Sequence, residues 1–276
     1  MCRASSHSPA REREAALIVA SSSPFREDVP DPLSAATPAT TPIAHAFHQR
    51  APETAGAYGG FGARVALVTG AEYAHRLGGM PEVIVFDLYG VIARTQTEAA
   101  RERLVELAGV PAEHFWRAYW ACRPAYDAGQ EGVAYWETVA GHLGTRFADV
   151  PALLRADLES WSQVDEEMVG LVCELADEGR RLGLLSNIIE DLVPVWETRH
   201  GSWLGRFAAL TFSCRIGVAK PDPRAYEICA DRMGVSPSDV LFFDDNEANV
   251  VAAREAGMAA ELFLSADQVR ALTARF

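Results

Sequence analysis

The sequence predicts an α/β protein with a doubly wound parallel sheet and an inserted helical cap domain. Two observations support this fold class. From Pro81 onward, short runs of β-branched and aromatic residues alternate with segments of helical spacing, and this alternation is typical of a parallel sheet covered by helices on both faces. After the first strand, the alternation is interrupted by residues 95–164, which have helical spacing and no strand signal. We therefore expect this block to form a cap inserted into the sheet domain.

Five segments are expected to form the strands of the sheet. Each is a short, mostly apolar run, as expected for strands that are buried on both faces. In chain order, these segments are residues 83–87, 182–186, 208–213, 240–244 and 259–263.

Helix-terminal residues locate the helices between these strands. Asp165 is a typical N-cap with two glutamates directly after it, and Gly179 ends that helix. Asp222 and Pro223 are a typical N-cap and first residue of a helix that runs to about residue 233. Further helices are expected over 246–256, before Gly257, and over 266–274, and within the cap over 95–110, 112–119, 133–143 and 150–161.

Residues 1–80 differ in composition from the rest of the chain. They are rich in Ala, Ser, Thr and Pro and have no sustained helix-like or strand-like period. Such a segment buries too little apolar surface to offset the entropy lost when it is ordered. We expect a disordered extension over 1–80, an α/β core made of 81–94 and 165–276, and a helical cap over 95–164.

Composition excludes several classes of partner. The 276 residues include 25 Lys and Arg against 38 Asp and Glu, a formal net charge of −13, which repels nucleic acid and anionic lipid. No apolar run approaches the roughly 20 residues of a membrane span. The five cysteines are an odd number without C-x-x-C spacing, which argues against zinc and a disulfide framework. We expect a cytoplasmic protein that binds neither nucleic acid nor membranes.

Polar residues follow four predicted strands or the loops after them. In open α/β sheets, ligands bind beyond the carboxyl ends of the strands, so we expect these residues to meet at one site. The four groups are Asp87 with Tyr89 and Gly90, Ser186 with Asn187, Lys220, and Asp244 with Asp245.

Lys220 is the only lysine of the chain, whose other Lys/Arg positions are all arginine. An ammonium is a compact point charge, whereas a guanidinium is a wide planar fork, and the two do not substitute for each other in a tight anion site. A single lysine beside the helix-start signal Asp222-Pro223 therefore indicates an anion-binding role.

The acidic pair Asp244-Asp245 ends a strand that is expected to be buried. Neighbouring carboxylates repel each other unless a cation lies between them and a third acid. A Mg²⁺ ion held by Asp87 and Asp245, together with water and a substrate phosphate, removes this repulsion. The Ser186 hydroxyl and the helix-start N–H groups near Asn187 are candidates for holding phosphate oxygens.

The four groups together resemble the sequence motifs of the haloacid dehalogenase-like superfamily, in its branch with a helical cap after the first motif. They are most similar to its sugar-phosphate phosphatases and to the phosphatase domain of soluble epoxide hydrolases. The resemblance implies a Rossmann-like core in which Asp87 attacks phosphorus to form an aspartyl-phosphate. It further implies that Asp87, Asp245 and the Tyr89 carbonyl bind Mg²⁺, that Asp244 supports this metal site, and that Ser186 and Lys220 hold the transferring group.

Tyr89 departs from the phosphatase pattern, in which a second aspartate lies two residues after the nucleophile. The segment Phe-Asp-Leu-Tyr-Gly is instead similar to the 2-haloacid dehalogenases, where an aspartate displaces halide without metal. A missing general acid costs about 10²–10⁴ in rate, and the cost falls when the leaving group is a weak base. We therefore expect a preference for a sugar 1-phosphate or an acyl phosphate over an alkyl phosphate.

Two alternatives to a phosphatase stay open from the sequence. One is a 2-haloacid dehalogenase that uses Asp87 without metal, and the other is a fold retained for binding or regulation with little catalysis. In every case the cap is expected to decide the small-molecule substrate, and Arg123 is a candidate contact for a second anionic group of a phosphorylated substrate.

Overall fold

The computed structural model describes residues 81–274, so the expected disorder of residues 1–80 lies outside the described residues. Five strands form one sheet in the order β3-β2-β1-β4-β5, and every neighbouring pair is parallel. This confirms the predicted sheet. The strands are β1 (Val83–Phe86), β2 (Arg181–Ser186), β3 (Ala209–Phe212), β4 (Val240–Asp244) and β5 (Ala259–Leu262).

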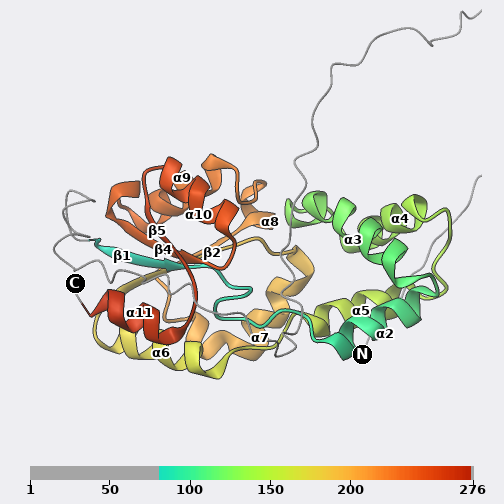
Figure 1. Cartoon of the computed structure of the whole chain (residues 1–276), viewed down its shortest axis with the longest axis horizontal. Coiled ribbons are helices and arrows are strands. Elements are labelled where there is room, and N and C mark those ends of the chain that lie inside the picture. The colour runs from blue at the N-terminus through green and yellow to red at the C-terminus, as the bar shows by residue number, and fades with distance from the viewer. Residues whose placement is uncertain (1–80, 275–276) are drawn as a thin grey trace, which may run out of the picture. The chain divides into compact units, whose positions relative to one another are not determined.

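Helices cover both faces of this sheet (Figure 1). On one face, Val83 and Val85 of β1 pack with buried residues of α9 (Pro223–Met233) and α10 (Glu247–Glu255). On the other face, Ile84 and Phe86 belong to a cluster that includes α6 (Glu166–Asp177), α7 (Val193–Leu204) and α11 (Ala266–Thr273). Alternate residues of β1 thus face opposite layers, as the period of a strand requires. Three short helical segments complete the core: η1 (Glu190–Leu192), α8 (Ser213–Ile216) and η2 (Pro237–Asp239).

The predicted helix starts are confirmed by their hydrogen bonds. The Asp165 carboxylate accepts from the N–H groups of residues 167 and 168, and the Asp222 carboxylate accepts from the N–H of residue 224. Gly179, just after α6, has the left-handed φ of +84° that glycine accepts readily.

Two helices differ from the sequence prediction. Helix α7 begins later than the helix start expected near Asn187: residues 187–189 are not helical, η1 begins at Glu190, and α7 begins at Val193 without a side-chain cap. Burial of Trp196 and Trp203 stabilises this helix. The helix predicted over 112–119 continues to residue 127 although Pro124 lies inside it. Tertiary contacts of its last turns outweigh the missing hydrogen bond of the proline.

The helical insert consists of α2 (Glu98–Ala108), α3 (Ala112–Asp127), α4 (Gly132–His142) and α5 (Val150–Ser160). The two chain segments that connect it to the sheet pair with each other. Ala93 and Val164 form an antiparallel bridge, and the N–H of Arg94 donates to the carbonyl of Gln163 at 2.9 Å. This pairing lies at the boundaries expected from the sequence, and the division into a core and a separate cap domain stays a prediction.

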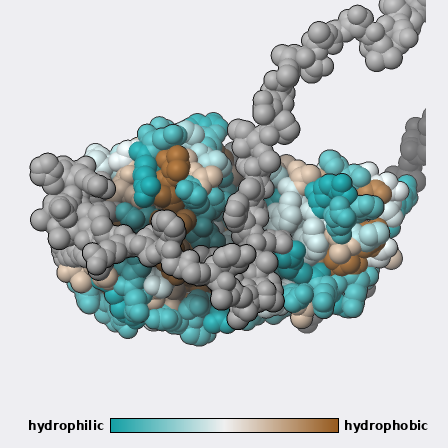
Figure 2. Space-filling model, viewed as in Figure 1, coloured by the Kyte–Doolittle hydropathy of each residue, from teal (hydrophilic) through white to brown (hydrophobic). Residues whose placement is uncertain are grey.

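The visible described surface is mostly hydrophilic, with only small hydrophobic areas (Figure 2). Within residues 81–274, no helix combines the length and the apolar character that crossing a membrane requires. Four large side chains of the insert, Phe115, Tyr119, Tyr135 and Trp136, are fully buried against one another.

Candidate active site

Three of the predicted residues lie at the ends of the three central strands. Asp87 follows β1, and its backbone N–H donates to the Phe243 carbonyl of β4 at 2.8 Å. Ser186 ends the neighbouring strand β2, and Asp244 ends β4 on the other side. The strand order therefore brings together residues that are about 60 to 160 positions apart in the sequence.

Lys220 joins two of these strand ends through its side chain. Its ammonium Nζ lies 2.8 Å from Asp87 Oδ1 and 2.6 Å from Asp244 Oδ2. All three side chains are buried. The only lysine of the chain thus lies at the predicted site, paired with two carboxylates.

A third carboxylate, from Asp245, completes an acidic cluster. One oxygen from each of Asp87, Asp244 and Asp245 lies within 4.8 Å of the others. Two donors orient Asp244: the Asn249 amide lies 3.1 Å from each carboxylate oxygen, and the backbone N–H of Asn246 lies 2.8 Å from Oδ1. Asp245 is the exposed member of the cluster. Three negative charges therefore face one positive charge, and the surplus is open to solvent on one side.

The local electrostatics reflect this surplus. Burial raises the pKa of Asp87 well above its usual range; Lys220 opposes this shift, and the charges of Asp244 and Asp245 add to it. The Asp245 carboxyl is partly buried, and this burial together with the charge of Asp244 raises its pKa to about 6. Burial lowers the pKa of Lys220, but the two carboxylates outweigh that effect and raise it, so the ammonium stays charged.

Gly90 leaves the space that the Asp245 carboxylate occupies. A Cβ atom on Gly90 would lie 2.0 Å from Asp245 Oδ2, and the residue has a left-handed φ of +83°. Both observations require glycine at this position. The turn after β1 is therefore shaped around the third carboxylate.

Ser186 and Asn187 differ in how their side chains are used. Ser186 Oγ is fully buried and has no hydrogen-bond partner among the described residues. The Asn187 amide is fully engaged with the backbone of Lys220: it donates to the Lys220 carbonyl and accepts from its N–H, both at 2.8 Å. The Ser186 hydroxyl is thus available for a ligand, whereas a substrate contact of Asn187 would fall to its backbone.

Tyr89 lies between two tryptophans. Its hydroxyl accepts a hydrogen bond from Trp196 Nε1 at 3.0 Å, and its ring makes edge contacts with Trp161 and Trp196 at centroid distances of 5.1 and 6.0 Å. Burial raises the pKa of the Tyr89 phenol, so it stays protonated at neutral pH. None of the hydrogen bonds between described residues ends on the Tyr89 carbonyl oxygen, which is the predicted metal ligand.

Arg123 is buried in the insert rather than exposed on it. Its Nε lies 2.8 Å from Asp127 Oδ1, and its Nη1 donates to the Tyr119 hydroxyl at 2.6 Å. The guanidinium also lies 5.6 Å from the ring centroids of Tyr126 and Trp161. The predicted contact of Arg123 with an anionic group of the substrate stays a prediction.

Three residues near the site, Asn249, Trp161 and Trp196, were not predicted from the sequence to have a role. Asn249 has a usable signal, because it lies one helical turn after the Asp-Asp-Asn segment, on the side of α10 that faces Asp244. The two tryptophans have none, since 35 positions separate them in the sequence and only the fold brings both rings to Tyr89.

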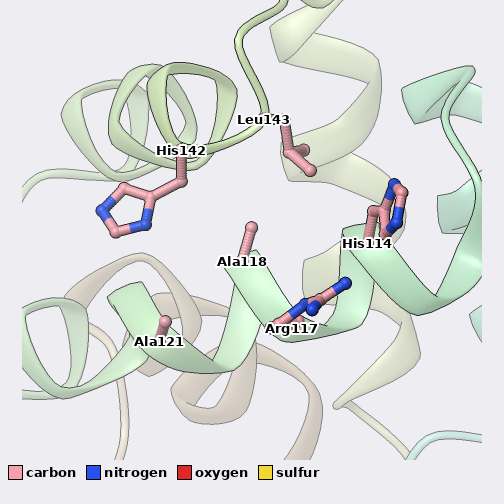
Figure 3. Close-up of a pocket in the computed structure, with 6 residues that line it drawn as sticks. All are labelled: His114, Arg117, Ala118, Ala121, His142 and Leu143. Atoms are coloured by element: carbon pink, nitrogen blue, oxygen red, sulfur yellow. The ribbon is translucent and has the colours of Figure 1, made fainter.

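A pocket of about 250 Å³ lies between α3 and α4, lined by residues that include His114, Arg117 and His142 (Figure 3). In the close-up, the two histidine rings lie on opposite sides of the pocket and do not approach each other. None of the predicted site residues lines it. It is separate from the acidic cluster.

The acidic cluster fits a Mg²⁺ ion. Carboxylate oxygens are the ligands that Mg²⁺ prefers, and its bonds of about 2.1 Å place opposite ligands about 4.2 Å apart. The three carboxylate oxygens lie within 4.8 Å of one another, close to this span, and the surplus of negative charge has the right sign.

The family model of the haloacid dehalogenase-like hydrolases matches residues 81–257, which include the whole acidic cluster. The chain belongs to this family. It is accordingly an enzyme of the hydrolase class, and its parallel sheet with helical inserts is the family's core.

Similar proteins agree with this assignment. The chain is 31% identical to the protein named Phosphatase MT3486 of Mycobacterium tuberculosis, over 68% of this chain and 89% of that protein. A family enzyme of Bacteroides thetaiotaomicron, solved with magnesium and inorganic phosphate, shares the fold with a TM-score of 0.58 at 16% identity, over 69% and 99% of the two chains. L-2-haloacid dehalogenase of Xanthobacter autotrophicus shares it with a TM-score of 0.53 at 21% identity, over 71% and 83%.

Proposed function

We propose that this hydrolase is a Mg²⁺-dependent phosphatase of small phosphorylated metabolites and forms an aspartyl-phosphate on Asp87. The observation that carries the proposal is the cluster of three carboxylates beside a single buried ammonium. A halide-displacing aspartate does not need two further carboxylates next to it, because they repel an anionic substrate. A phosphoryl-transfer site needs these carboxylates, since they hold the cation that offsets the phosphate charge.

In this mechanism, an oxygen of Asp87 attacks phosphorus, the P–O bond to the leaving group breaks, and the leaving oxygen takes a proton from water. The Lys220 ammonium balances negative charge on the transferring group, and Ser186 Oγ, which has no hydrogen-bond partner among the described residues, donates to a phosphate oxygen. Water then cleaves the aspartyl-phosphate and restores the carboxylate. Mg²⁺, when bound by Asp87, Asp245 and the Tyr89 carbonyl with Asp244 supporting them, supplies charge neutralisation and orientation.

Tyr89 sets the range of leaving groups. Its phenol stays protonated and already accepts a hydrogen bond from Trp196, so it can donate a hydrogen bond but is a poor proton donor. We infer that substrates with weakly basic leaving groups, such as sugar 1-phosphates and acyl phosphates, turn over faster than alkyl phosphates.

The deciding experiment is phosphate release from a panel of phosphorylated metabolites, with Mg²⁺ and with EDTA, for wild type and Asp87→Asn. We expect metal-dependent release that Asp87→Asn abolishes. Chloride release from 2-chloropropionate without metal would instead identify a dehalogenase. Mg²⁺-dependent ligand binding without turnover would identify a binding protein, and either of these results would refute the proposal.

A further inference from the structure

The end of helix α3 and the segment after α5 contact chain segments that follow strands β1, β2 and β3. The Tyr126 hydroxyl donates to Asp191 Oδ2 at 3.0 Å, and the Ser213 hydroxyl at the end of β3 donates to the Asp127 carbonyl at 2.6 Å. Trp161 touches the ring of Tyr89. The last contact places a side chain that follows the insert beside Tyr89, the residue two positions after Asp87.

The positive charge on this side of the site, that of the Arg123 guanidinium, is already paired with a carboxylate of the protein. Arg123 is 7% exposed and pairs with Asp127 at 2.8 Å. The Tyr119 hydroxyl that accepts from Arg123 in turn donates to the carboxylate of Asp157, which is fully buried, at 2.8 Å. One cation therefore lies among two carboxylates. The arginines of the adjacent elements are engaged as well, since Arg199 pairs with Glu159 and Arg215 with both Glu190 and Glu197.

This arrangement opposes a second negative charge on the substrate. An anionic group could bind Arg123 only by displacing Asp127, which would leave a carboxylate in a largely buried position without its partner, and that is costly. The phosphate end of the substrate meets Lys220, but the other end meets no uncompensated cation among the residues described above.

Aromatic rings occupy the same region. Trp120, Arg123 and Asp127 follow the three- and four-residue spacing of one helix face. The ring centroid of Trp120 lies 6.3 Å from that of Trp161, which in turn lies 5.1 Å from that of Tyr89. Trp120 and Tyr89 are each only half-buried. We call these three residues the aromatic wall; ring faces of this kind bind flat, uncharged groups.

We propose that the site selects phosphomonoesters whose leaving group is uncharged and carries a ring, either aromatic or sugar, that packs on the aromatic wall. The inference rests on the proposed phosphatase function and narrows its substrate class. It excludes small anionic phosphoesters, in which a carboxylate would face the Arg123–Asp127 pair. Arg123 then acts as a positioning residue for the wall and not as an anion receptor.

A matched substrate pair tests the charge preference. Glucose 1-phosphate and glucuronic acid 1-phosphate have the same anomeric leaving oxygen and differ by one carboxylate. We expect kcat/KM to favour the neutral sugar by about tenfold or more, the order for leaving one buried charge unpaired. Equal or faster turnover of the glucuronic acid ester would overturn the inference.

The variant Asp127→Asn provides the complementary test. It removes the carboxylate that pairs with Arg123. We therefore expect a lower KM for glucuronic acid 1-phosphate, which reduces the preference for glucose 1-phosphate in kcat/KM. Asp177→Asn is the control, because it removes an Asp–Arg pair with a 2.7 Å contact on the distant helix α6. An unchanged preference in Asp127→Asn, or the same change in Asp177→Asn, would contradict the proposal.

Acetyl phosphate and phenyl phosphate test the ring preference. Acetyl phosphate has a good leaving group and no ring, and phenyl phosphate distinguishes an aromatic ring from a sugar. We expect Trp120→Leu to raise KM more for the ring-bearing substrates than for acetyl phosphate, and an equal change for all three refutes the role of the wall. Absence of phosphate release from every compound would refute the phosphatase proposal itself; release that Asp87→Asn abolishes, but with charged substrates preferred, would refute only this inference.

Discussion

Two ionic clusters of this protein, one at the strand ends and one in the helical insert, each hold more carboxylates than cations. They differ in how far their carboxylates are exposed to solvent. At the strand ends, Asp87 and Asp244 pair with the ammonium of Lys220, and the third carboxylate, Asp245, is exposed. In the insert, Asp127 pairs with the guanidinium of Arg123, and the Tyr119 hydroxyl links Arg123 to Asp157, which is fully buried. Both clusters therefore hold more negative than positive charge.

The two clusters differ in their access to solvent, and this difference suits them to different roles. Burial raises the pKa of Asp157, and the charge of Arg123 and the hydrogen bond from Tyr119 oppose this shift. The Tyr119 hydroxyl accepts from Arg123 and Trp161 and donates to Oδ1 of Asp157, whereas Asp157 Oδ2 is buried without a hydrogen-bond partner among the described residues. The strand-end cluster instead keeps an exposed carboxylate and an unpartnered Ser186 hydroxyl. The cluster that is open to solvent is therefore suited to bind a ligand, whereas the enclosed cluster is suited to stabilise the folded structure.

The largest expected effect comes from removing the cation of the strand-end cluster. Lys220→Met leaves three carboxylates without their ammonium and the transferring phosphate without its counter-charge. We expect kcat/KM for the best substrate to fall by about 10³-fold. Steady-state kinetics of this variant beside Arg103→Met, which removes an exposed arginine of α2, measure the effect. A loss below tenfold would show that the two clusters are more alike than we propose.

Gly90→Ala tests whether the space for Asp245 matters. The new Cβ cannot coexist with the Asp245 carboxylate in its present position, and the backbone there is left-handed. We expect about 10²-fold loss of activity, the scale of a displaced catalytic group. Thermal denaturation with and without Mg²⁺ gives a second readout, since an ion bound to the folded state raises the melting temperature. Gly141→Ala, where a Cβ meets no atom within 4 Å, is the matched control. Equal stabilisation by Mg²⁺ in wild type and Gly90→Ala would argue against a metal site at Asp245.

Asn187→Ala removes two hydrogen bonds that hold the backbone of Lys220. Because the ammonium itself remains, we expect a smaller loss of about tenfold, mainly in kcat, together with weaker inhibition by inorganic phosphate. Asn187→Asp keeps the acceptor and loses the donor, so it should fall between wild type and alanine. A variant with unchanged kinetics and only a lower melting temperature would assign Asn187 a structural role alone.

The smallest effect is expected in the enclosed cluster. Burial raises the pKa of Asp157 in the folded protein, so the folded state binds its proton more tightly than the unfolded chain, where the pKa is about 3.9. That contribution to stability is present below the unfolded pKa and is lost as pH rises through the folded value. The variant Asp157→Asn lacks this proton-linked contribution to stability. The difference between its free energy of unfolding and that of wild type should therefore increase as pH rises above about 4, by less than about 2 kcal/mol. Urea denaturation across this range measures it, and a flat difference would contradict the shift.

Much of the fold was predictable because its signals are local. The five strands are short apolar runs between polar segments, and Asp165 and Asp222 start their helices by hydrogen-bonding to N–H groups within three residues. The start of α7 and the second half of α3 differ from the prediction because packing, and not local preference, stabilises them.

The features of the site likewise divide into those that the sequence predicts and those that only the tertiary structure shows. The sequence alone determined which residues would gather, because carboxyl ends of neighbouring parallel strands lie at one edge of a sheet and Asp87, Ser186, Lys220 and Asp244 follow such ends. Only the tertiary structure decided what each side chain does there: the engagement of Asn187 by Lys220, the space that Gly90 leaves for Asp245, and the enclosure of Arg123 between Asp127 and aromatic rings. These depend on distances between segments far apart in the chain, which no local pattern encodes.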